Sequence, residues 1–423
     1  MFFQKSLLLV TSKLALLVLV ILVSSSVGLG NKGKLTRKLN MTLNPNCSLP
    51  ECKGETDNSI NLVHVTAEGD SDVLHYVWSS VGAPSVLIAC TSLNSTLEID
   101  WKNLLNESEV EGSINFSEKP YYSLGLVLAK IWQFNDTEDV GKLDSGSNIS
   151  FPLPLMEMQW ENINRTMHCS NNHCSAVFHT LSSDPKYFLP NGSFSFEVTA
   201  HSHDGRSNIL PHLDHTANSS QLNIVLNGMN SEFNGSRFAL EFILIGSDTI
   251  TEKESNVEIE SQKSIDDEYT PGIFERDVLM TPASHFTGSG GYLQWKPVCY
   301  TKDERTIAHS TESYSYGIQK TNNSLPFSIT KAFFNSSLPP NSLSAFNISF
   351  GSSGDGFYLK TNYTSWSMTV GYGRPPSDQF SLMIILIISI GLGTPLILMV
   401  VWGVGFCVQK FTRKQDDLLL SSD

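Results

Sequence analysis

Fifteen N-glycosylation sequons, Asn-x-Ser or Asn-x-Thr, limit what this chain can fold into more than any other feature of its sequence. An asparagine that carries a sugar must stay in solvent, so each sequon marks a position that the hydrophobic core has to exclude. Sugars on nearly every exposed loop also shield a surface from proteases. The sequence therefore predicts a heavily glycosylated protein of the secretory pathway, with sugars at Asn40, Asn46, Asn94, Asn106, Asn115, Asn135, Asn148, Asn164, Asn191, Asn218, Asn234, Asn322, Asn335, Asn347 and Asn362.

The amino terminus has the features of a signal peptide. Two lysines, Lys5 and Lys13, precede the apolar stretch Leu14–Val23, and the small residues that follow at 26–28 suit a signal peptidase. We interpret residues 1–28 as a removed signal peptide. The alternative, an uncleaved anchor, is less favoured because this apolar stretch is short for a membrane span.

A second apolar segment, Phe380–Val408, carries no charge over its 29 residues. That exceeds the roughly 20 residues that a helix needs to cross a bilayer. Three basic residues follow it closely, whereas Arg374 is the only nearby basic residue on the other side, so the positive flank is cytoplasmic. The sequence predicts a single-pass type I protein with a transmembrane helix at 380–408 and a cytoplasmic tail at 409–423.

The short tail contains an acidic residue, Asp416, three positions before the pair Leu419 and Leu420. This pattern resembles the dileucine signals that clathrin adaptors read in endosomal and lysosomal sorting. The alternative is an apolar patch without function. We predict a sorting signal at these three residues, and hence the lysosomal membrane as the destination.

The charge of the chain limits its partners. The formal net charge is −14, and all eleven histidines precede the membrane segment. The lumenal part is therefore acidic at neutral pH and closer to neutral where carboxylates and imidazoles take up protons. No basic cluster exists outside residues 32–38 and the tail, which argues against nucleic acid as a partner.

Six cysteines lie in the predicted lumenal part, an even number as disulfide pairing requires. Short spacings favour two small loops, and these would leave one pair to join distant segments. Because six cysteines allow fifteen pairings, this is a preference rather than a deduction. Zinc binding is disfavoured in the oxidising secretory pathway. The preferred pairs are Cys47 with Cys52, Cys169 with Cys174, and Cys90 with Cys299.

Apolar residues alternate with polar ones along the lumenal sequence, which predicts half-buried strands. Longer apolar runs at Pro84–Cys90 and Leu124–Phe134 predict strands covered on both faces. Asn347 must point away from the core that its two neighbours enter. The clearest alternation is at Phe194, Phe196 and Val198; Leu222, Ile224 and Leu226; Phe238, Leu240, Phe242 and Leu244; and Phe346, Ile348 and Phe350.

Turn residues interrupt these segments about every ten residues, as in antiparallel sandwiches. We therefore predict an all-β ectodomain of the antiparallel β-sandwich type, followed by one transmembrane helix. Residues 247–268 contain eight acidic residues and two lysines, which indicates a loop or linker. It would divide a β-rich domain at 29–246 from a second β-rich segment at 269–379, although one sheet shared across it stays possible.

Motifs of common enzymes are missing from the sequence. It contains no G-x-S-x-G, G-x-x-x-x-G-K-[ST], H-E-x-x-H or G-x-G-x-x-G. The glycines at 351–356 indicate a turn, and the acidic residues at 266–268 are adjacent, so they point apart. We predict no catalytic residue and no cofactor.

Four histidines, His201, His203, His212 and His215, form the most metal-like group in the sequence. The first two would share one face of a strand, and the second two could return beside them after a turn. Solvated loop histidines, or groups whose charge responds to pH, are the alternatives that we favour over a metal site.

Five segments look familiar as a set: HYVWSS at 75–80, SIDDEYTPGIF at 264–274, KAFF at 331–334, AFNISFG at 345–351 and SWSM at 365–368. Together with the sequons, the span and the short tail, they resemble the glycosylated lysosomal membrane protein family over nearly the whole mature chain. The resemblance implies a non-enzymatic accessory subunit of a lysosomal dipeptide transporter of the major facilitator superfamily, whose sugars shield that transporter from proteases. The resemblance also implies a tyrosine-based sorting signal at the carboxy terminus, and the dileucine pattern of this tail departs from it.

Two stretches, Cys47–Leu93 and Gly235–Thr321, contain no sequon. Aromatic residues on a surface without sugars are where a partner can dock. We predict that a transporter contacts His75, Tyr76, Trp78, Tyr269, Phe274, Tyr292 and Trp295, and the alternative is that these residues form the core. Other possible functions are a lumenal sorting receptor and an acid hydrolase with an unrecognised active site.

Overall fold

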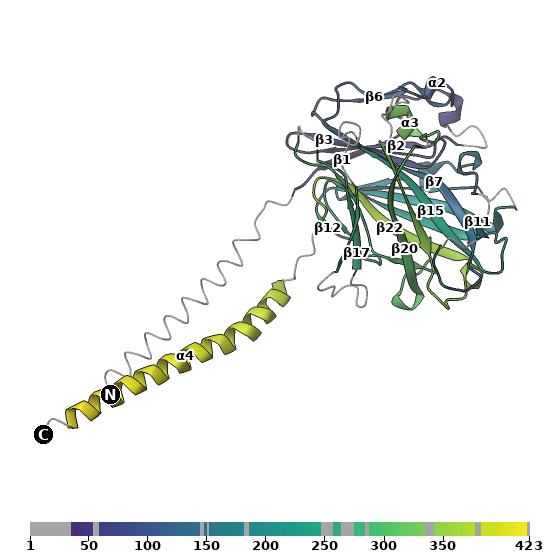
Figure 1. The fold of residues 1–423 in the computed structure, drawn as a ribbon. Helices are drawn as coiled ribbons and strands as arrows, with labels where there is room; N and C mark the ends of the chain where they lie inside the picture. The colour runs from purple at the N-terminus through teal and green to yellow at the C-terminus, as the bar shows by residue number, and fades with distance from the viewer. Residues whose placement is uncertain are drawn as a thin grey trace. The chain divides into compact units, whose positions relative to one another are not determined.

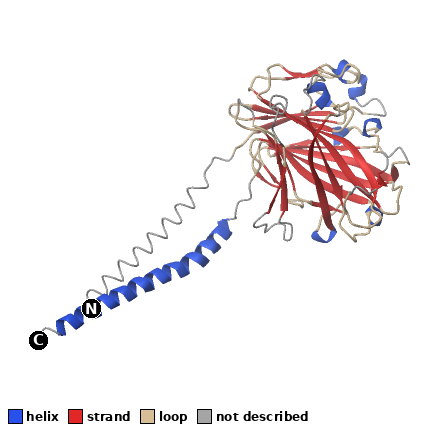
Figure 2. Cartoon of the chain, in the orientation of Figure 1, coloured by secondary structure: helices blue, strands red, loops and turns tan. Residues whose placement is uncertain are grey.

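The protein consists largely of β-strands, as Figure 2 shows. A computed structural model describes residues 35–53, 59–143, 148–149, 152–181, 186–246, 257–263, 275–283, 287–322, 324–334, 342–376 and 382–420. They fall into two compact units, one over Leu35–Pro376 and one that contains the carboxy-terminal helix. The predicted signal peptide lies outside the described residues.

One antiparallel sheet, which we call the first sheet, contains the strands nearest the amino terminus (Figure 1). Its order is β1 (Lys38–Leu43), β2 (Leu62–Glu68), β3 (Val73–Ser79), β4 (Ser85–Thr91), β7 (Tyr122–Asn135), β15 (Ser236–Gly246), β21 (Leu343–Phe350) and β20 (Ser310–Thr321), with β8 (Asn148–Ile149) on the end of β7.

The second sheet is also antiparallel. Its order is β9 (His168–Cys169), β10 (His173–His179), β11 (Phe188–His201), β14 (Ser219–Met229), β22 (Tyr363–Tyr372), β18 (Gly291–Trp295), β17 (Glu275–Met280) and β16 (Ile259–Lys263). A short strand, β19 (Val298–Tyr300), pairs with both β22 and β20. The first residues of β20 pair with β19 and the rest pair with β21, so β20 links the two sheets.

The main core lies between the inner faces of the two sheets. Phe196 and Ile224 of the second sheet belong to the same buried cluster as Leu126 and Phe242 of the first. In β11 and β14 buried residues alternate with half-exposed ones, as the sequence predicts. The sandwich is the arrangement in which both sheets bury one face.

The outer face of the first sheet is covered as well. A second buried cluster joins Val77 and Leu87 of this sheet to Trp101, Leu104 and Ile329 above it. The predicted strands at 84–90 and 124–134 are accordingly buried on both faces over most of their length, which confirms that prediction. The cover consists of β5 (Leu97–Ile99), α2 (Trp101–Leu104), β6 (Ile114–Phe116) and α3 (Ile329–Phe334).

The acidic segment does not separate two domains. Strands β14 and β15, which precede it, pair with β22 and β21, which follow it. Part of the segment is itself β16, at the edge of the second sheet. The division at 247–268 therefore needs correction: one fold spans it, because each sheet needs strands from both sides to complete its core.

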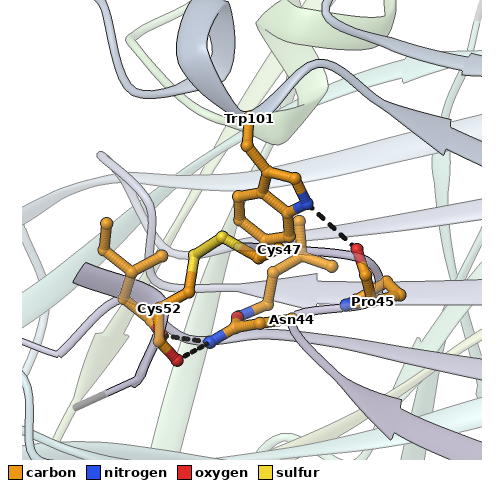
Figure 3. The surroundings of a disulfide bond; sticks show 7 residues. Asn44, Pro45, Cys47, Cys52 and Trp101 are labelled. Carbon is orange, nitrogen blue, oxygen red and sulfur yellow. Dashed lines mark hydrogen bonds between the residues drawn. A yellow bond between two sulfur atoms is a disulfide. The ribbon is translucent and has the colours of Figure 1, made fainter. Parts of the chain in front are cut away.

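Two of the three preferred disulfides are present, Cys47–Cys52 and Cys169–Cys174. Figure 3 shows the first, beside Trp101, whose indole nitrogen donates to the carbonyl of Pro45 at 3.0 Å. The third pairing was wrong, because Cys90 and Cys299 are both free and buried. They lie on β4 and β19, in different sheets, and their sulfurs contact different groups: Asp72 Oδ2 at 3.5 Å and the carbonyl of Glu312 at 3.3 Å.

The carboxy-terminal helix α4 runs from Leu382 to Leu420, with Pro395 inside it. Its segment Gly393–Lys410 is long and apolar enough to cross a membrane, and no other helix among the described residues is. The helix continues past the predicted end of the span at Val408, so residues 416–420, with the predicted sorting signal, are helical rather than extended.

Candidate functional site

The sequon asparagines lie on the surface of the fold. Thirteen of them have described side chains; nine of these are exposed, four are half-buried, and none is buried. Asn347 on β21 is half-exposed between two buried neighbours, as its place on the strand requires. The fold can therefore carry sugars at these positions, and their occupancy stays a prediction. Asn335 lies outside the described residues.

Two regions hold most of the sequons. One is the outer side of the first sheet and its cover, with Asn40, Asn46, Asn94, Asn106, Asn115, Asn322 and Asn347. The other, which we call the glycan end, is one end of the strands and holds Asn135, Asn148, Asn191, Asn234 and Asn362. There Asn135 pairs with both Asn148 and Ser236, and the carbonyl of Asn362 accepts from Gly228 N at 2.7 Å.

The aromatic residues predicted to face a partner form the core instead. His75, Tyr76, Trp78, Tyr292 and Trp295 are at most 1% exposed. Strand β3 is buried along its whole length, so its aromatic and apolar residues reflect burial rather than a docking surface. This prediction was wrong for these five residues. Tyr269 and Phe274 lie outside the described residues.

Three of the four predicted histidines come together on the outer face of the second sheet. The rings of His201 and His215 stack with their centroids 3.5 Å apart, and His203 lies 6.4 Å from His215. His212 donates from Nδ1 to the carbonyl of Ser207 at 2.8 Å. Among the residues that the structure describes, no group of three or more histidine, cysteine or acidic side chains could hold a metal ion.

Burial keeps the stacked histidines neutral. Desolvation, with smaller repulsion from neighbouring histidines, lowers the pKa of His201 to about 3 and that of His215 to about 4. Within the described part of the chain, neither His201 Nε2 nor His215 Nδ1 has a hydrogen-bond partner. Two neutral rings can stack this closely because no charge has to be solvated between them.

A second buried histidine pair was not anticipated from the sequence. His64 Nε2 lies 2.9 Å from His75 Nδ1, and His75 Nε2 lies 3.0 Å from the hydroxyl of Thr91. Desolvation lowers the pKa of His64 to about 4 and, together with repulsion from His64, that of His75 to about 3. The alternation of β2 against β3 brings these residues together, and only the register of the two strands would have revealed it.

A cluster of three carboxylates surrounds Arg237, which is 2% exposed. Its guanidinium contacts Asp136 at 2.7 Å, Asp139 at 2.5 Å and Asp355 at 2.9 Å. Burial opposes the ionisation of Asp355, but hydrogen bonds and attraction from Arg237 outweigh it and lower the pKa of this carboxyl. A carboxylate held ionised is a poor proton donor, so this cluster suits a structural role better than acid catalysis.

The cavities lined by these elements are small. One of about 20 Å³ lies between the sheets beside Phe196 and Phe242, and another of about 20 Å³ lies beside Arg237. A hollow of about 170 Å³ lies beside Ile318 and Lys320 on β20. Pockets for small molecules are typically about 300–1,000 Å³, so none of these three has the usual size of a ligand site.

Comparison with known proteins gives a consistent result. Residues 61–413 match the family model described as glycosylated lysosomal membrane protein. Glycosylated lysosomal membrane protein B of Xenopus laevis is 36% identical over 381 residues, which cover 88% of this chain and 90% of that protein. The Danio rerio protein is 33% identical and covers 94% and 95%, and the Homo sapiens protein is 31% identical and covers 86% of each.

A solved structure, galactose 1-epimerase from Lactobacillus acidophilus, covers 81% of this chain at 8% identity with a TM-score of 0.32. This likeness is too weak to support an argument about fold or activity. The relatives, by contrast, match along nearly the whole chain. Among the described residues of this chain, one carboxy-terminal helix is long and apolar enough to span a membrane. The chain belongs to the glycosylated lysosomal membrane protein family and is a single-pass protein of the lysosomal membrane.

Proposed function

We propose that this protein is a non-enzymatic accessory subunit that stabilises a lysosomal transporter of the major facilitator superfamily and protects it from proteolysis. The family resemblance implies a dipeptide exporter as that transporter. The ectodomain would act through its folded surface and its sugars, and the single helix would hold it beside the partner in the membrane.

The observation that carries this proposal is the placement of the sequons. Most of them occupy the outer side of the first sheet and the glycan end, and none with a described side chain is buried. Sugars in these two regions would keep proteases away from the polypeptide beneath them and from a partner that it covers. A chain selected for this task needs a rigid scaffold and many exposed asparagines rather than a cleft.

Stabilisation of the partner has a simple thermodynamic basis. Whatever binds the folded state of a protein and not the unfolded state shifts the equilibrium toward the folded state. Proteolysis proceeds through open states, so a bound subunit also lowers the population that a protease can cut. Neither effect requires an active site, and the buried contacts of Arg237 with Asp136 and Asp355 fit a scaffold.

We also propose that clathrin adaptors deliver the protein through Asp416, Leu419 and Leu420. Replacing both leucines with alanine should send the protein to the cell surface, as measured by surface biotinylation, because the adaptor pocket loses its two apolar side chains. Replacement of Leu418 with alanine is the matched control and should leave delivery unchanged. Equal surface levels for both variants would contradict a dileucine signal.

Capture of the epitope-tagged full chain from lysosomes in mild detergent, followed by mass spectrometry, tests the main proposal. We expect one polytopic transporter in near-stoichiometric amount, and its level should fall when the gene for this chain is removed. Recovery of soluble cargo alone would favour a sorting receptor, and recovery of nothing would contradict the accessory role.

A further inference from the structure

The outer face of the second sheet differs from every other described surface of the sandwich. The outward residues of β10, β11 and β14 are half-exposed, and they include Val177, Glu197, Thr199 and Gln221. The described helices of the unit Leu35–Pro376 are at most six residues long. This surface, which we call the bare face, also includes the segment 203–216 and the loop 301–309.

Arg305 joins these two segments to the strands of the second sheet by hydrogen bonds. It donates to the hydroxyl of Ser367 at 2.8 Å and to the side chain of Asn223, both on outward positions of the sheet. It also donates to the carbonyl of Leu210 at 2.9 Å, which joins the loop to the segment 203–216. The three parts therefore form one continuous surface.

No described sequon asparagine lies within β10, the regularly paired stretch of β11 at 193–200, or β14. Asparagines do occur there, at Asn208, Asn223 and Asn227, but none is followed by Ser or Thr at the second position. Four sequons lie at its borders: Asn164 is in η3 (Ile163–Arg165) beside the edge strand β10, Asn191 is at the irregular start of β11, and Asn218 and Asn362 directly precede β14 and β22. Sugars would thus surround the bare face without covering it.

The bare face is rich in histidine. Eight of the eleven histidines of the chain lie on it. Two of these, His201 and His215, are the stacked pair, and the other six are exposed or half-exposed. The six are His168, His173, His179, His203, His212 and His309.

Two large apolar side chains are exposed on the same surface. Ile209 is 63% exposed and Ile307 is 57% exposed. Ile209 adjoins Leu210, whose carbonyl binds Arg305, and Ile307 follows Arg305 by two positions in η4 (Ile307–His309). Both isoleucines therefore flank the arginine that joins the two segments, and an apolar centre with polar surroundings is the usual anatomy of a protein interface.

We propose that the bare face docks onto a carboxylate-bearing lumenal surface of the transporter, and that the acidity of the lysosome strengthens this contact. The inference rests on the accessory role proposed above and names the surface that performs it. The partner would place carboxylates against the six accessible histidines and apolar side chains against Ile209 and Ile307.

The charge of the bare face supports an acidic partner. The described elements present six carboxylates and three cations to it, so it is net negative when its histidines are neutral. Histidine is the side chain type that can gain charge between pH 8 and pH 5, and four charges gained on this face would make it net positive. The charged groups are Glu161, Glu197, Asp204, Asp214, Asp303, Glu304, Arg206, Lys302 and Arg305, with the phenols of Tyr300 and Tyr363 beside Arg305.

A protein surface suits this face better than an anionic membrane does. Membrane-binding surfaces rely on clusters of Lys and Arg. Here Arg305 is engaged by Leu210, Ser367 and Asn223, and Arg206 lies 4.0 Å from Asp214. The positive charge comes instead from histidines distributed over several strands, which matches scattered carboxylates on a folded partner.

Added sugars provide a test. Glu197→Asn creates a sequon with Thr199 in the middle of the bare face, and Glu304→Asn creates one with Thr306 on the loop that carries Ile307. The matched controls remove the same carboxylate without adding a sugar: Glu197→Asn with Thr199→Val, and Glu304→Gln. Asn347→Gln, which removes a sugar from the opposite side, is a third control. A mobility shift reversed by endoglycosidase verifies each added sugar, and delivery to lysosomes verifies folding.

The measured quantity is the amount of transporter that each variant captures at pH 5, relative to the unaltered full chain. We expect each added sugar to lower its recovery at least tenfold and each control to stay within twofold. Recovery with the unaltered chain should be several-fold lower at pH 7.4 than at pH 5, and replacing His173 and His203 with glutamine should reduce this difference. Because the two sugars lie on different elements, misfolding of one variant leaves the other informative.

Four outcomes are distinguishable. If the unaltered chain captures the transporter and both sugar-bearing variants capture it equally well, the bare face is not the docking surface, although the accessory role stands. If the unaltered chain captures no transporter at either pH, the accessory role itself fails. Recovery that is equal at pH 5 and pH 7.4 would overturn the role of the histidines. Recovery that is insensitive to the sugars but requires anionic lipid would assign the face to the membrane.

Discussion

Arg237 on β15 holds together the segments that follow β7 and β21. It neutralises Asp136 and Asp139 after β7 and Asp355 after β21, and it is almost fully buried. Removal of one partner from a buried ion pair typically costs about 3–5 kcal/mol, because the remaining charges lose their compensation. We expect Arg237→Gln to lower the free energy of unfolding by an amount in this range, as measured by urea denaturation of the purified chain.

The matched control for Arg237 is a pair on the surface. Lys130 lies 3.1 Å from Glu241, but the lysine side chain is 37% exposed. Exposed ion pairs contribute about 0–1 kcal/mol, so Lys130→Gln should change stability little. Equal effects of the two substitutions would show that Arg237 does not hold these loops and strands together.

The buried His75 makes the free energy of unfolding depend on pH. Burial lowers its pKa in the folded protein to about 3, below the ordinary value of 6.5, so the unfolded chain binds a proton first as the pH falls. Stability from this group is complete above pH 6.5 and is lost toward pH 3. Between pH 7 and pH 5 the loss is about 2 kcal/mol. His75→Gln should therefore flatten the pH dependence of unfolding, whatever its effect at pH 7; an unchanged slope would contradict the assignment.

At the scale of elements, sequence patterns predicted where the strands lie but not which segments cover them. Alternation identified β11, β14, β15 and β21, and unbroken apolar runs identified β4 and β7, because burial on one or two faces leaves a direct imprint on the sequence. The same reasoning failed for β3. An aromatic-rich strand looks alike in sequence whether it is exposed to a partner or covered by other elements, and its cover here comes from β6 and α3, far along the chain.

Long-range pairing explains the other misses. The Arg237 cluster joins residues more than 90 positions apart, and nothing local marks Asp136 or Asp355 as its partners. Pairing by elimination failed for Cys90 and Cys299 for the same reason, since only the fold shows that their strands belong to different sheets. The short-range disulfides were predictable because spacing alone brings their cysteines together.

The free cysteines can be counted directly. If Cys90, Cys299 and Cys407 carry thiols, alkylation of the denatured chain without reductant should label three cysteines, and peptide mapping should locate all three. Alkylation after reduction is the reference and should label all seven. Labelling of Cys407 alone would restore the pairing of Cys90 with Cys299 and contradict the structure.

At the scale of the whole molecule, the sandwich has sides of different character. The outer side of the first sheet and the glycan end carry most of the sequons, while the bare face on the second sheet carries histidines and has sequons at its borders. This asymmetry fits the proposed accessory role: the glycosylated surfaces would face the lumen, and the bare face would contact the partner. The sequence shows how many sequons there are, but only the strand order shows which surface of the sandwich has few of them.

The lifetime of the partner tests the central claim most directly. We would measure the lysosomal half-life of the captured transporter in cells that lack this chain, with and without re-expression of the full chain. We predict a half-life several-fold shorter without the chain, restored by re-expression and prolonged in its absence by inhibitors of lysosomal proteases. A transporter that persists equally long without this chain would contradict the proposal that the protein exists to protect it.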